Sequence, residues 1–377
     1  MRDVVLVGGG HSHVLLLRGL VDRPWTGARL TLVSDGTETL YSGMLPGCIA
    51  GLYRWDEARI DLRALCRAAG AAFVQSAAVG IDRIACEVRL ADGGAVPYEL
   101  MSLDVGAVPQ MNVPGAAEHA VAAKPFLRFK VRWTALLERA LHHHGPLTVV
   151  VVGAGAAGVE LALAVRHRLE AELRSRGRNA AQLRMHLVSA GEQLLPGHNA
   201  GVRRQLGTEL RARGIVLHLN ERVAELRAGT LRTASGLVLQ ADEIIWATGA
   251  GAPAWLRDTG LALDEHGFVQ VDARLRSVND ERIFAAGDVA SLQGRRVQKA
   301  GAVAVHQAPV LAHNLRAALA GQALRTWRPK PHWLALIGTG GRHAVASRGG
   351  FSASGRWVWL WKDWLDRRFM RKFDFGS

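Results

Sequence analysis

The chain has 377 residues, of which 49% are hydrophobic and 21% charged, a composition that supplies enough apolar surface for two or three folded domains. The formal net charge of +14 favours anionic partners, namely nucleotides or an acidic lipid surface. No nucleic-acid-binding motif accompanies this charge, so we expect no nucleic-acid partner.

The sequence also indicates the cellular compartment in which we expect the protein. The first strand begins at Val4, which leaves no room for a signal peptide, and no apolar run reaches the roughly 18 residues of a spanning helix. The three cysteines, Cys48, Cys66 and Cys86, form neither a CxxC pair nor a metal-ligand cluster. We therefore expect no metal and a cytoplasmic location, either free or peripheral on the cytoplasmic face of the inner membrane.

Residues 4–34 predict a first βαβ unit. Val4–Val7 is an apolar strand, Gly8–Gly10 a tight turn, Val14–Leu20 a helix and Arg29–Ser34 a second strand. A glycine turn between a buried strand and a helix N-terminus lets the backbone approach a pyrophosphate. The helix dipole and the free N–H groups then stabilise the phosphate charge.

Residues 40–105 predict a loop, a helix and three strands. Leu40–Gly51 is rich in small residues and is expected to be a loop, whereas Asp61–Ala69 has helical spacing with Asp61 at its N-cap. Strands are expected over Ala72–Val79, Ile84–Leu90 and Tyr98–Val105, with Asp92–Gly94 as the hairpin turn between the last two.

A second glycine turn follows the predicted helix Phe126–His144. The segment Leu147–Val165, LTVVVVGAGAAGVELALAV, again predicts a strand, a turn and a helix, and its first glycine lies 145 residues after that of the first turn. One such turn is a weak signal, but two in matched context predict two dinucleotides and electron transfer between them. The later elements are expected at Arg184–Ser189, Val202–Arg213, Ile215–Asn220, Ile283–Ala290 and Ala302–Leu319.

The C-terminal stretch is aromatic and basic. Over Arg356–Phe373, RWVWLWKDWLDRRFMRKF, helical spacing predicts one apolar and one charged face. Tryptophan beside basic residues is typical of a helix in a membrane interface, and packing on the protein's own surface or in a homodimer is the alternative. The apolar face comprises Trp357, Trp361, Trp364, Leu365, Phe369 and Phe373, and the charged face comprises Lys362, Asp363, Asp366, Arg367 and Arg371.

The order of the two glycine turns, then Ala247-Thr248-Gly249, then Ala285–Asp288 resembles the pyridine nucleotide–disulfide oxidoreductase superfamily over Arg2–Ala320. The resemblance implies an α/β fold with two Rossmann-like, three-layer dinucleotide-binding domains, in which the NAD domain is inserted in a discontinuous FAD domain. The implied boundaries are 1–120 and 250–330 for the FAD domain, 121–249 for the NAD(P) domain and 331–377 for an aromatic-rich C-terminal extension.

Three features most resemble type II NADH dehydrogenases and sulfide:quinone reductases: the loop Tyr41–Pro46, the sequence GVELA over Gly158–Ala162, and the tail. The pattern also resembles a bacterial subgroup found fused to selenophosphate synthetase. The resemblance implies electron transfer from NADH or NADPH through FAD to a quinone or another small acceptor, without proton pumping. The alternatives are a soluble FAD reductase of a sulfur or selenium compound, and a redox-sensing flavin-binding module with a degraded nicotinamide site.

The superfamily's binding residues can be carried over to the matching positions of this sequence. The resemblance implies FAD contacts at Gly8, Gly9, Gly10, His11, Ser12, His13, Ser34, Asp35, Gly43, Pro46, Val79, Gly287 and Asp288, and NAD(P) contacts at Gly153, Gly155, Ala156, Gly158, Ser189, Thr248 and Gly249. It also suggests four catalytic candidates at the flavin, which are Glu160, Lys124, His306 and Gln307. For Glu160, Lys124 and His306, a purely local structural role is the alternative.

The sequence departs from the superfamily pattern in both turns. His13 stands where the first turn usually has its third glycine, and His11 and His13 either contact the cofactor or cap the helix. Ser34 and Ser189 occupy the positions at which an acidic residue usually hydrogen-bonds a ribose hydroxyl. A carboxylate there would repel a 2′-phosphate, so NADPH is not excluded as the donor.

The cysteines depart from the pattern as well. Cys48 lies near the expected flavin loop but has no nearby partner, which argues against disulfide reduction and against sulfide oxidation through cysteines. Cys66 and Cys86 are expected to be buried small apolar residues.

Overall fold

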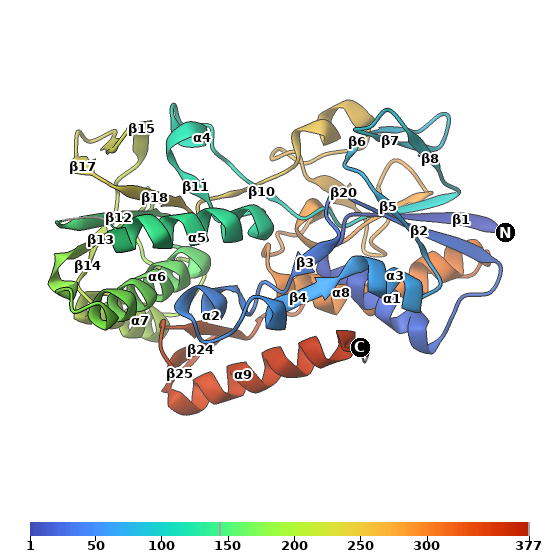
Figure 1. Cartoon of the computed structure of the whole chain (residues 1–377). Coiled ribbons are helices and arrows are strands. Elements are labelled where there is room, and N and C mark those ends of the chain that lie inside the picture. Colours follow the sequence, from blue (N-terminus) through green and yellow to red (C-terminus); the bar gives the residue numbers. More distant parts are fainter. Residues whose placement is uncertain (143–144, 376–377) are drawn as a thin grey trace.

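The computed structural model describes residues 1–142 and 145–375. Two parallel sheets form the two ends of the molecule, and each has its own hydrophobic core (Figure 1). The expected α/β class with two Rossmann-like sheets is confirmed. The expected helix over 126–144 is observed as far as residue 142, and its last two positions lie outside the described residues.

The first sheet has the strand order β21-β9-β1-β2-β5, with all strands parallel. Parallel strands covered on both faces are continuous apolar runs, and Val4–Val7 in the central strand is fully buried. Because β21 comes from late in the sequence, this sheet joins two separate stretches of the chain. Its strands are β1 (Arg2–Val7), β2 (Ala28–Ser34), β5 (Ala72–Gln75), β9 (Leu100–Leu103) and β21 (Ile283–Ala285).

Three helices pack against this sheet: α1 (His11–Asp22), α3 (Leu62–Ala68) and α8 (Gly301–Leu319). The predicted N-cap of α3 is confirmed, because the Asp61 carboxylate accepts the amide of Ala64 at 2.9 Å. The predicted strand over 283–290 is shorter than expected. It ends at residue 285, and a 3-10 turn containing the Gly-Asp pair follows.

The second sheet has the strand order β11-β18-β12-β13-β14, again parallel. Its strands are β11 (Val121–Ala122), β12 (Leu147–Val152), β13 (Leu183–Val188), β14 (Ile215–His218) and β18 (Glu243–Trp246). Helices α5 (Phe126–His142), α6 (Ala156–Ser175) and α7 (Ala200–Ala212) bury apolar faces in the core of this sheet. Each sheet thus places one glycine turn between its central strand and a helix.

The hairpin predicted around Asp92–Gly94 forms with a different partner strand. That turn joins β7 (Glu87–Leu90) to β8 (Ala95–Pro97), whereas β9 belongs to the first parallel sheet. The strand predicted from Ile84 begins at Glu87, because Ile84 to Cys86 form a turn in which Cys86 has φ +57°. Strand β6 (Ala78–Asp82) completes this small antiparallel sheet.

Residues 40–51, expected to be a loop, contain the short helix α2 (Leu45–Ala50). Pro46 lies in the first turn of this helix, where its missing N–H costs nothing. Gly51 ends the helix with φ +79°, a conformation that glycine adopts without strain. The sequence pattern predicts a loop here because six residues are too few to show helical periodicity.

Short elements connect the larger ones. The remaining strands are β3 (Glu38–Leu40), β4 (Arg59–Asp61), β10 (Val108–Pro109), β15 (Val223–Arg227), β16 (Thr230–Thr233), β17 (Val238–Gln240), β19 (Ala250–Gly251), β20 (Val269–Val271) and β22 (Ala290–Leu292). The remaining helical turns are α4 (Ala116–His119), η1 (Asp56–Ala58), η2 (Ala180–Gln182), η3 (Ala254–Thr259), η4 (Gly287–Val289) and η5 (Arg371–Phe373).

The C-terminal extension is an antiparallel sheet followed by a helix. Strands β23 (Ala335–Gly338), β24 (Ala344–Arg348) and β25 (Phe351–Gly355) lead into α9 (Arg356–Met370). Figure 1 shows α9 in red, running from the β24–β25 region toward the end of the molecule that holds the first sheet. Among the described residues, no helix is both long and apolar enough to cross a membrane.

The two predicted faces of α9 are wrong in part. Lys362 and Asp366, expected on the charged outer face, are buried with 8% and 4% exposure. Trp357 and Trp364 are about half exposed, together with Leu360. These two charged residues can be buried because they form an ion pair, with 2.6 Å between Lys362 Nζ and Asp366 Oδ2. Helix α9 therefore presents apolar side chains outward.

Candidate functional site

The first glycine turn is shaped by close backbone contacts. Gly8 has φ +95°, and a Cβ there would meet the main-chain carbonyl of Asp104. A Cβ on Gly9 would meet Leu62 at 2.6 Å. In the described part of the chain, the N–H groups of Gly9, Gly10 and His11 have no hydrogen-bond acceptor. Free amides at the N-terminus of a twelve-residue helix fit a diphosphate group.

Asp104, which the sequence analysis did not single out, completes this turn from the end of β9. Its carboxylate accepts the amide of Ser12 at 2.7 Å and that of His13 at 3.3 Å. It supplies the cap that Gly10, at the N-cap position of α1, cannot supply. Burial raises the pKa of Asp104 to about 7, in spite of these two hydrogen bonds. An acidic residue directly after an apolar strand was the available sequence signal.

The two histidines of the first turn have different surroundings. His13 is fully buried, and its ring bridges the carbonyl of Gly8 at 2.7 Å and the hydroxyl of Ser102 at 2.8 Å. It therefore packs between helix and strand instead of facing the phosphate site. His11 lies beside Tyr41, with ring centroids 5.6 Å apart. Burial lowers the pKa of both histidines to about 4, so both are neutral near pH 7.

The Gly287–Asp288 turn lies next to the first glycine turn, since a Cβ on Gly287 would also meet the Asp104 carboxyl group. The amide of Gly287 donates to the side chain of Gln307 at 2.7 Å, so this buried glutamine positions the turn. Asp288 forms an ion pair with Lys124 at 2.9 Å. Lys124 is therefore a partner of the Gly-Asp turn and not an isolated linker residue.

His306, the neighbour of Gln307 on α8, is held by tryptophans. Its Nδ1 accepts the indole N–H of Trp327 at 2.9 Å, and its ring meets Trp333 edge-on with centroids 5.3 Å apart. The structure therefore gives His306 the packed, hydrogen-bonded surroundings that were the structural alternative.

Glu160 is partly buried on α6, one turn after the second glycine turn. Its carboxylate accepts the amide of Gly338 at 2.7 Å. Burial raises the pKa of Glu160 to about 7, while the charge of Lys362 opposes that shift. Pro46, Gly338 and Lys362 line a small recess together with Glu160. A carboxyl group that titrates near neutral pH in such a recess can hold or release a proton.

The loop Tyr41–Pro46 is fixed by α9. Lys362 donates to the carbonyl of Gly43 at 2.5 Å, and the Tyr41 hydroxyl lies near the Asp366 carboxylate, which raises the pKa of Tyr41 after the larger effect of burial. The rings of Tyr41 and Phe369 stack with centroids 4.2 Å apart. The buried pair Lys362 and Asp366 thus connects the C-terminal helix to the predicted flavin loop.

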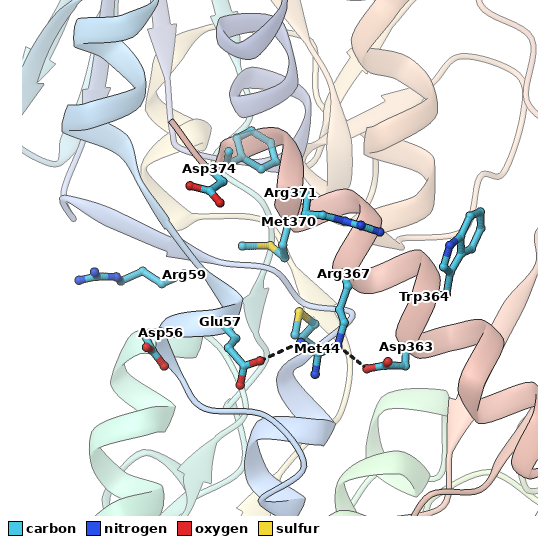
Figure 2. Close-up of a pocket in the computed structure, with 11 residues that line it drawn as sticks. Met44, Asp56, Glu57, Arg59, Asp363, Trp364, Arg367, Met370, Arg371 and Asp374 are labelled. Carbon is cyan, nitrogen blue, oxygen red and sulfur yellow. Dashed lines mark hydrogen bonds and ion pairs between the residues drawn. The ribbon is translucent and has the colours of Figure 1, made fainter. Parts of the chain in front are cut away.

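A cavity of about 580 Å³ opens between this loop, β4 and the end of α9. Figure 2 shows Arg367 between Glu57 and Asp363, with which it forms ion pairs of 2.9 Å each. Met44 and Met370 supply apolar surface. The full lining is Met44, Asp56, Glu57, Arg59, Asp363, Trp364, Arg367, Met370, Arg371, Phe373 and Asp374.

The second glycine turn keeps all three glycines for distinct reasons. Gly153 has φ +118°, and a Cβ there would meet the carbonyl of Ala247 at 2.7 Å. A Cβ on Gly158 would collide with the carbonyl of Gly153, so only glycine lets α6 pack this closely on its strand. Gly155 has nothing within 4 Å, which leaves room for a ligand beside Ala156. This arrangement fits a dinucleotide diphosphate.

The structure places the remaining predicted residues around the two turns. Ser34 is buried at the end of β2 and Asp35 beside it is exposed, whereas Val79 lies on β6 with its side chain half exposed. Ser189 follows β13 directly, and its hydroxyl accepts the amide of Gly191 at 3.3 Å. Thr248 and Gly249 follow β18, the strand beside the one that leads into the second turn.

The cysteines are separate from one another. Cys48 is buried on α2, where burial raises the pKa of its thiol to about 12, and Cys66 is buried on α3. Cys86 is partly buried in the turn before β7, where it packs against the core of the first sheet, so the expectation of a buried residue is only partly correct. None of the three forms a disulfide, and no cluster of three or more potential metal ligands exists among the described residues.

Comparisons with known proteins agree with this geometry. The model of the pyridine nucleotide-disulphide oxidoreductase family matches residues 2–308. The chain is 27% identical over 369 residues to a type II NADH:quinone oxidoreductase of Haemophilus influenzae, covering 87% of this chain and 83% of that protein. It is 24% identical to the demethylphylloquinone reductase NdbB of Synechocystis, covering 93% of this chain and 88% of that protein.

Two solved structures share the fold over 99% of this chain. One is the sulfide:quinone oxidoreductase of Aquifex aeolicus, with a TM-score of 0.83, 18% identity and 91% of that chain covered. The other is NDH2 of Plasmodium falciparum in complex with NADH, with a TM-score of 0.83, 14% identity and 97% of that chain covered. With the two glycine turns and the family match over residues 2–308, the chain belongs to the pyridine nucleotide-disulphide oxidoreductase family.

Proposed function

We propose that this chain is an FAD-dependent oxidoreductase that transfers electrons from NADH or NADPH to a quinone. One observation carries the proposal, namely the pair of glycine turns at Gly8–Gly10 and Gly153–Gly158, each with an open phosphate site at a helix N-terminus. The type II NADH:quinone oxidoreductase relative, which matches 87% of this chain, supports the quinone as acceptor. We retain 1–120, 121–249, 250–330 and 331–377 as the proposed domain boundaries.

Bound FAD would supply a two-electron carrier that takes a hydride from the nicotinamide and passes electrons on. The amides of Gly9 and Gly10 would hold its diphosphate, and the Asp288–Lys124 pair would lie beside it. Gln307 keeps the Gly287 turn in place. Glu160, which lines the recess beside the Tyr41–Pro46 loop, would hold a proton at its carboxyl oxygen.

The acceptor would enter from the α9 side of the molecule. The cavity between Met44 and Met370 lies beside the loop that Lys362 and Tyr41 connect to α9. The outward face of the helix exposes Trp357, Leu360 and Trp364 beside arginines, a composition suited to a membrane interface. A chain bound there through α9 would be peripheral on the cytoplasmic face of the inner membrane and could take a quinone from the lipid.

The electron-transfer proposal is tested with the purified full-length protein under anaerobic conditions. NADH or NADPH should bleach the visible absorbance of the bound flavin, and a soluble quinone analogue should restore it within the same experiment. Absence of bleaching with both donors contradicts the proposal. Bleaching without reoxidation by any quinone keeps the donor half and rejects the acceptor.

The membrane proposal has a separate test. The double variant Trp357→Gln/Trp364→Gln should lose co-sedimentation with vesicles of phosphatidylglycerol and phosphatidylethanolamine, because two half-exposed indoles supply the apolar contact. Val238→Gln, at an exposed apolar position on β17, serves as the matched control and should bind as the unmodified chain does. Equal binding by both variants contradicts the proposal.

A further inference from the structure

The first glycine turn contains a buried carboxyl group to which the proposed function gives no role. Asp104 is 3% exposed, and its Oδ2 accepts the amides of Ser12 and His13, the second and third residues of α1. A Cβ built on Gly10 or on Gly287 would run into this carboxyl group. Asp104 therefore lies between the two turns that are assigned to FAD above.

A diphosphate at this helix N-terminus would bring two negative charges close to a third. The free amides of Gly9, Gly10 and His11 precede directly the two amides that Asp104 already uses. Asp104 forms no ion pair with any residue that the structure describes, and Lys124 is paired with Asp288. Like charges in a site that excludes water cannot all remain ionised without a large penalty.

We propose that Asp104 is a positioning residue of the FAD site whose carboxyl group takes up one proton when FAD binds. The neutral carboxyl group can still accept the amide of Ser12, so α1 stays capped while the repulsion is removed. The inference rests on the proposed function only in taking FAD as the ligand of the first turn. Burial already raises the pKa of Asp104 to about 7, and a nearby diphosphate would raise it further.

The titration of other groups near this site must be distinguished from the titration of Asp104. Burial lowers the pKa of both histidines of the turn to about 4, so they stay neutral from pH 6 to 9. Burial lowers the pKa of Lys299 to about 8 while Asp288 opposes the shift, so this lysine titrates in the same range. The titratable groups around Asp104 and the two adjoining turns are His11, His13, Lys124, Asp288 and Lys299.

The test is the pH dependence of FAD affinity, measured by titrating FAD onto the full-length protein after removal of its flavin. The dissociation constant of the unmodified chain should be constant below pH 7. Above pH 7 it should rise by about tenfold per pH unit, because one proton is then bound together with FAD. Asp104→Asn should remove this slope, and any remaining slope above pH 8 belongs to Lys299.

The sign of the effect distinguishes a charge role from a purely structural one. At pH 9, Asp104→Asn should bind FAD more tightly than the unmodified chain, by up to about a hundredfold, because the repelling charge is absent. Loss of a helix cap alone would weaken binding at every pH. Asp272→Asn is the matched control, since Asp272 also accepts two main-chain amides, from Arg274 and Arg276, and should keep the slope of the unmodified chain.

A second measurement requires no variant and covers the case in which Asp104→Asn does not fold. In infrared difference spectra at pH 8, FAD binding to the unmodified chain should produce the carbonyl band of a newly protonated carboxylic acid. Equal pH slopes for the unmodified chain and Asp104→Asn, or no such band, overturn the inference. FAD binding with flavin bleaching by NADH would still leave the proposed function intact, whereas no FAD binding at any pH would reject both.

Discussion

The two glycine turns begin in the same way and are completed differently. In the first, the carbonyl of Gly8 accepts the ring N–H of His13, and Asp104 caps the helix. In the second, the carbonyl of Gly153 lies directly against the bare Cα of Gly158. The third glycine of such turns is therefore one of two ways to seat a helix on a strand. The other is a side chain large enough to fill the gap and polar enough to bond the carbonyl.

The largest effect is expected when the first turn is given the third glycine of the second turn. His13→Gly should lower the free energy of unfolding by about 4 kcal/mol, because it leaves a cavity and two buried polar groups without partners. Urea unfolding monitored by circular dichroism measures this loss. Ser102→Ala, which removes only one hydrogen bond, should cost about 1 kcal/mol. A loss below about 1 kcal/mol for His13→Gly would show that the two turns are interchangeable.

The next largest effect is expected when the third glycine of the second turn is replaced by a larger residue. Gly158→Val should slow flavin bleaching by NADH at least about a hundredfold, because α6 must move away from Gly153 and misplace the nicotinamide. FAD content should be unchanged, since the first turn is untouched. Gly197→Ala, at a position outside both turns with nothing within 4 Å, should change the rate only a few-fold. Similar rates for the two variants would argue against the packing explanation.

The carboxyl groups near the two turns should differ in what they control. Because burial raises the pKa of Glu160 to about 7, it is protonated below that pH and loses its proton as the pH rises. If Glu160 delivers a proton, quinone reduction should fall about tenfold per pH unit above pH 7. Glu160→Gln should be slow at all pH values without this slope, with unchanged bleaching by NADH. Stopped-flow reoxidation measures the slope, and an identical slope in the variant would exclude this role.

The smallest expected effect concerns the two strand ends. Ser189→Asp should shift the donor preference toward NADH by about tenfold, because a carboxylate there repels a 2′-phosphate. The same change at the first turn, Ser34→Asp, should leave the preference as it is, since FAD carries no 2′-phosphate. The ratio of kcat/KM for the two donors measures both, and an unchanged ratio in Ser189→Asp would place nucleotide recognition elsewhere.

Most of the fold followed from local patterns. Continuous apolar runs before each glycine turn predicted the central strands β1 and β12, and both lie at the centre of a parallel sheet. The errors occurred where the pattern was short or was decided by a partner. Helix α2 has too few residues to show a period, and the strand after Tyr98 joined a parallel sheet in place of the predicted hairpin.

The candidate site was predicted less completely than the fold. The glycines and the Gly287–Asp288 turn came from motifs, but Lys124 and Gln307 acquired their roles through contacts 164 and 20 residues away in sequence. Asp104 reaches the amide of Ser12 across 92 residues, a contact that no local pattern encodes.

By itself, the sequence determined that two strand–turn–helix units lie on one chain, because backbone conformation and apolar periodicity are local properties. The tertiary structure alone decided which side chains complete each unit. It buried Lys362 and Asp366 on the face of α9 that helical spacing had assigned to solvent, since an ion pair can be buried when each charge finds its partner. It also set Asp104 against the first turn, because strand order brings the end of β9 beside the start of α1.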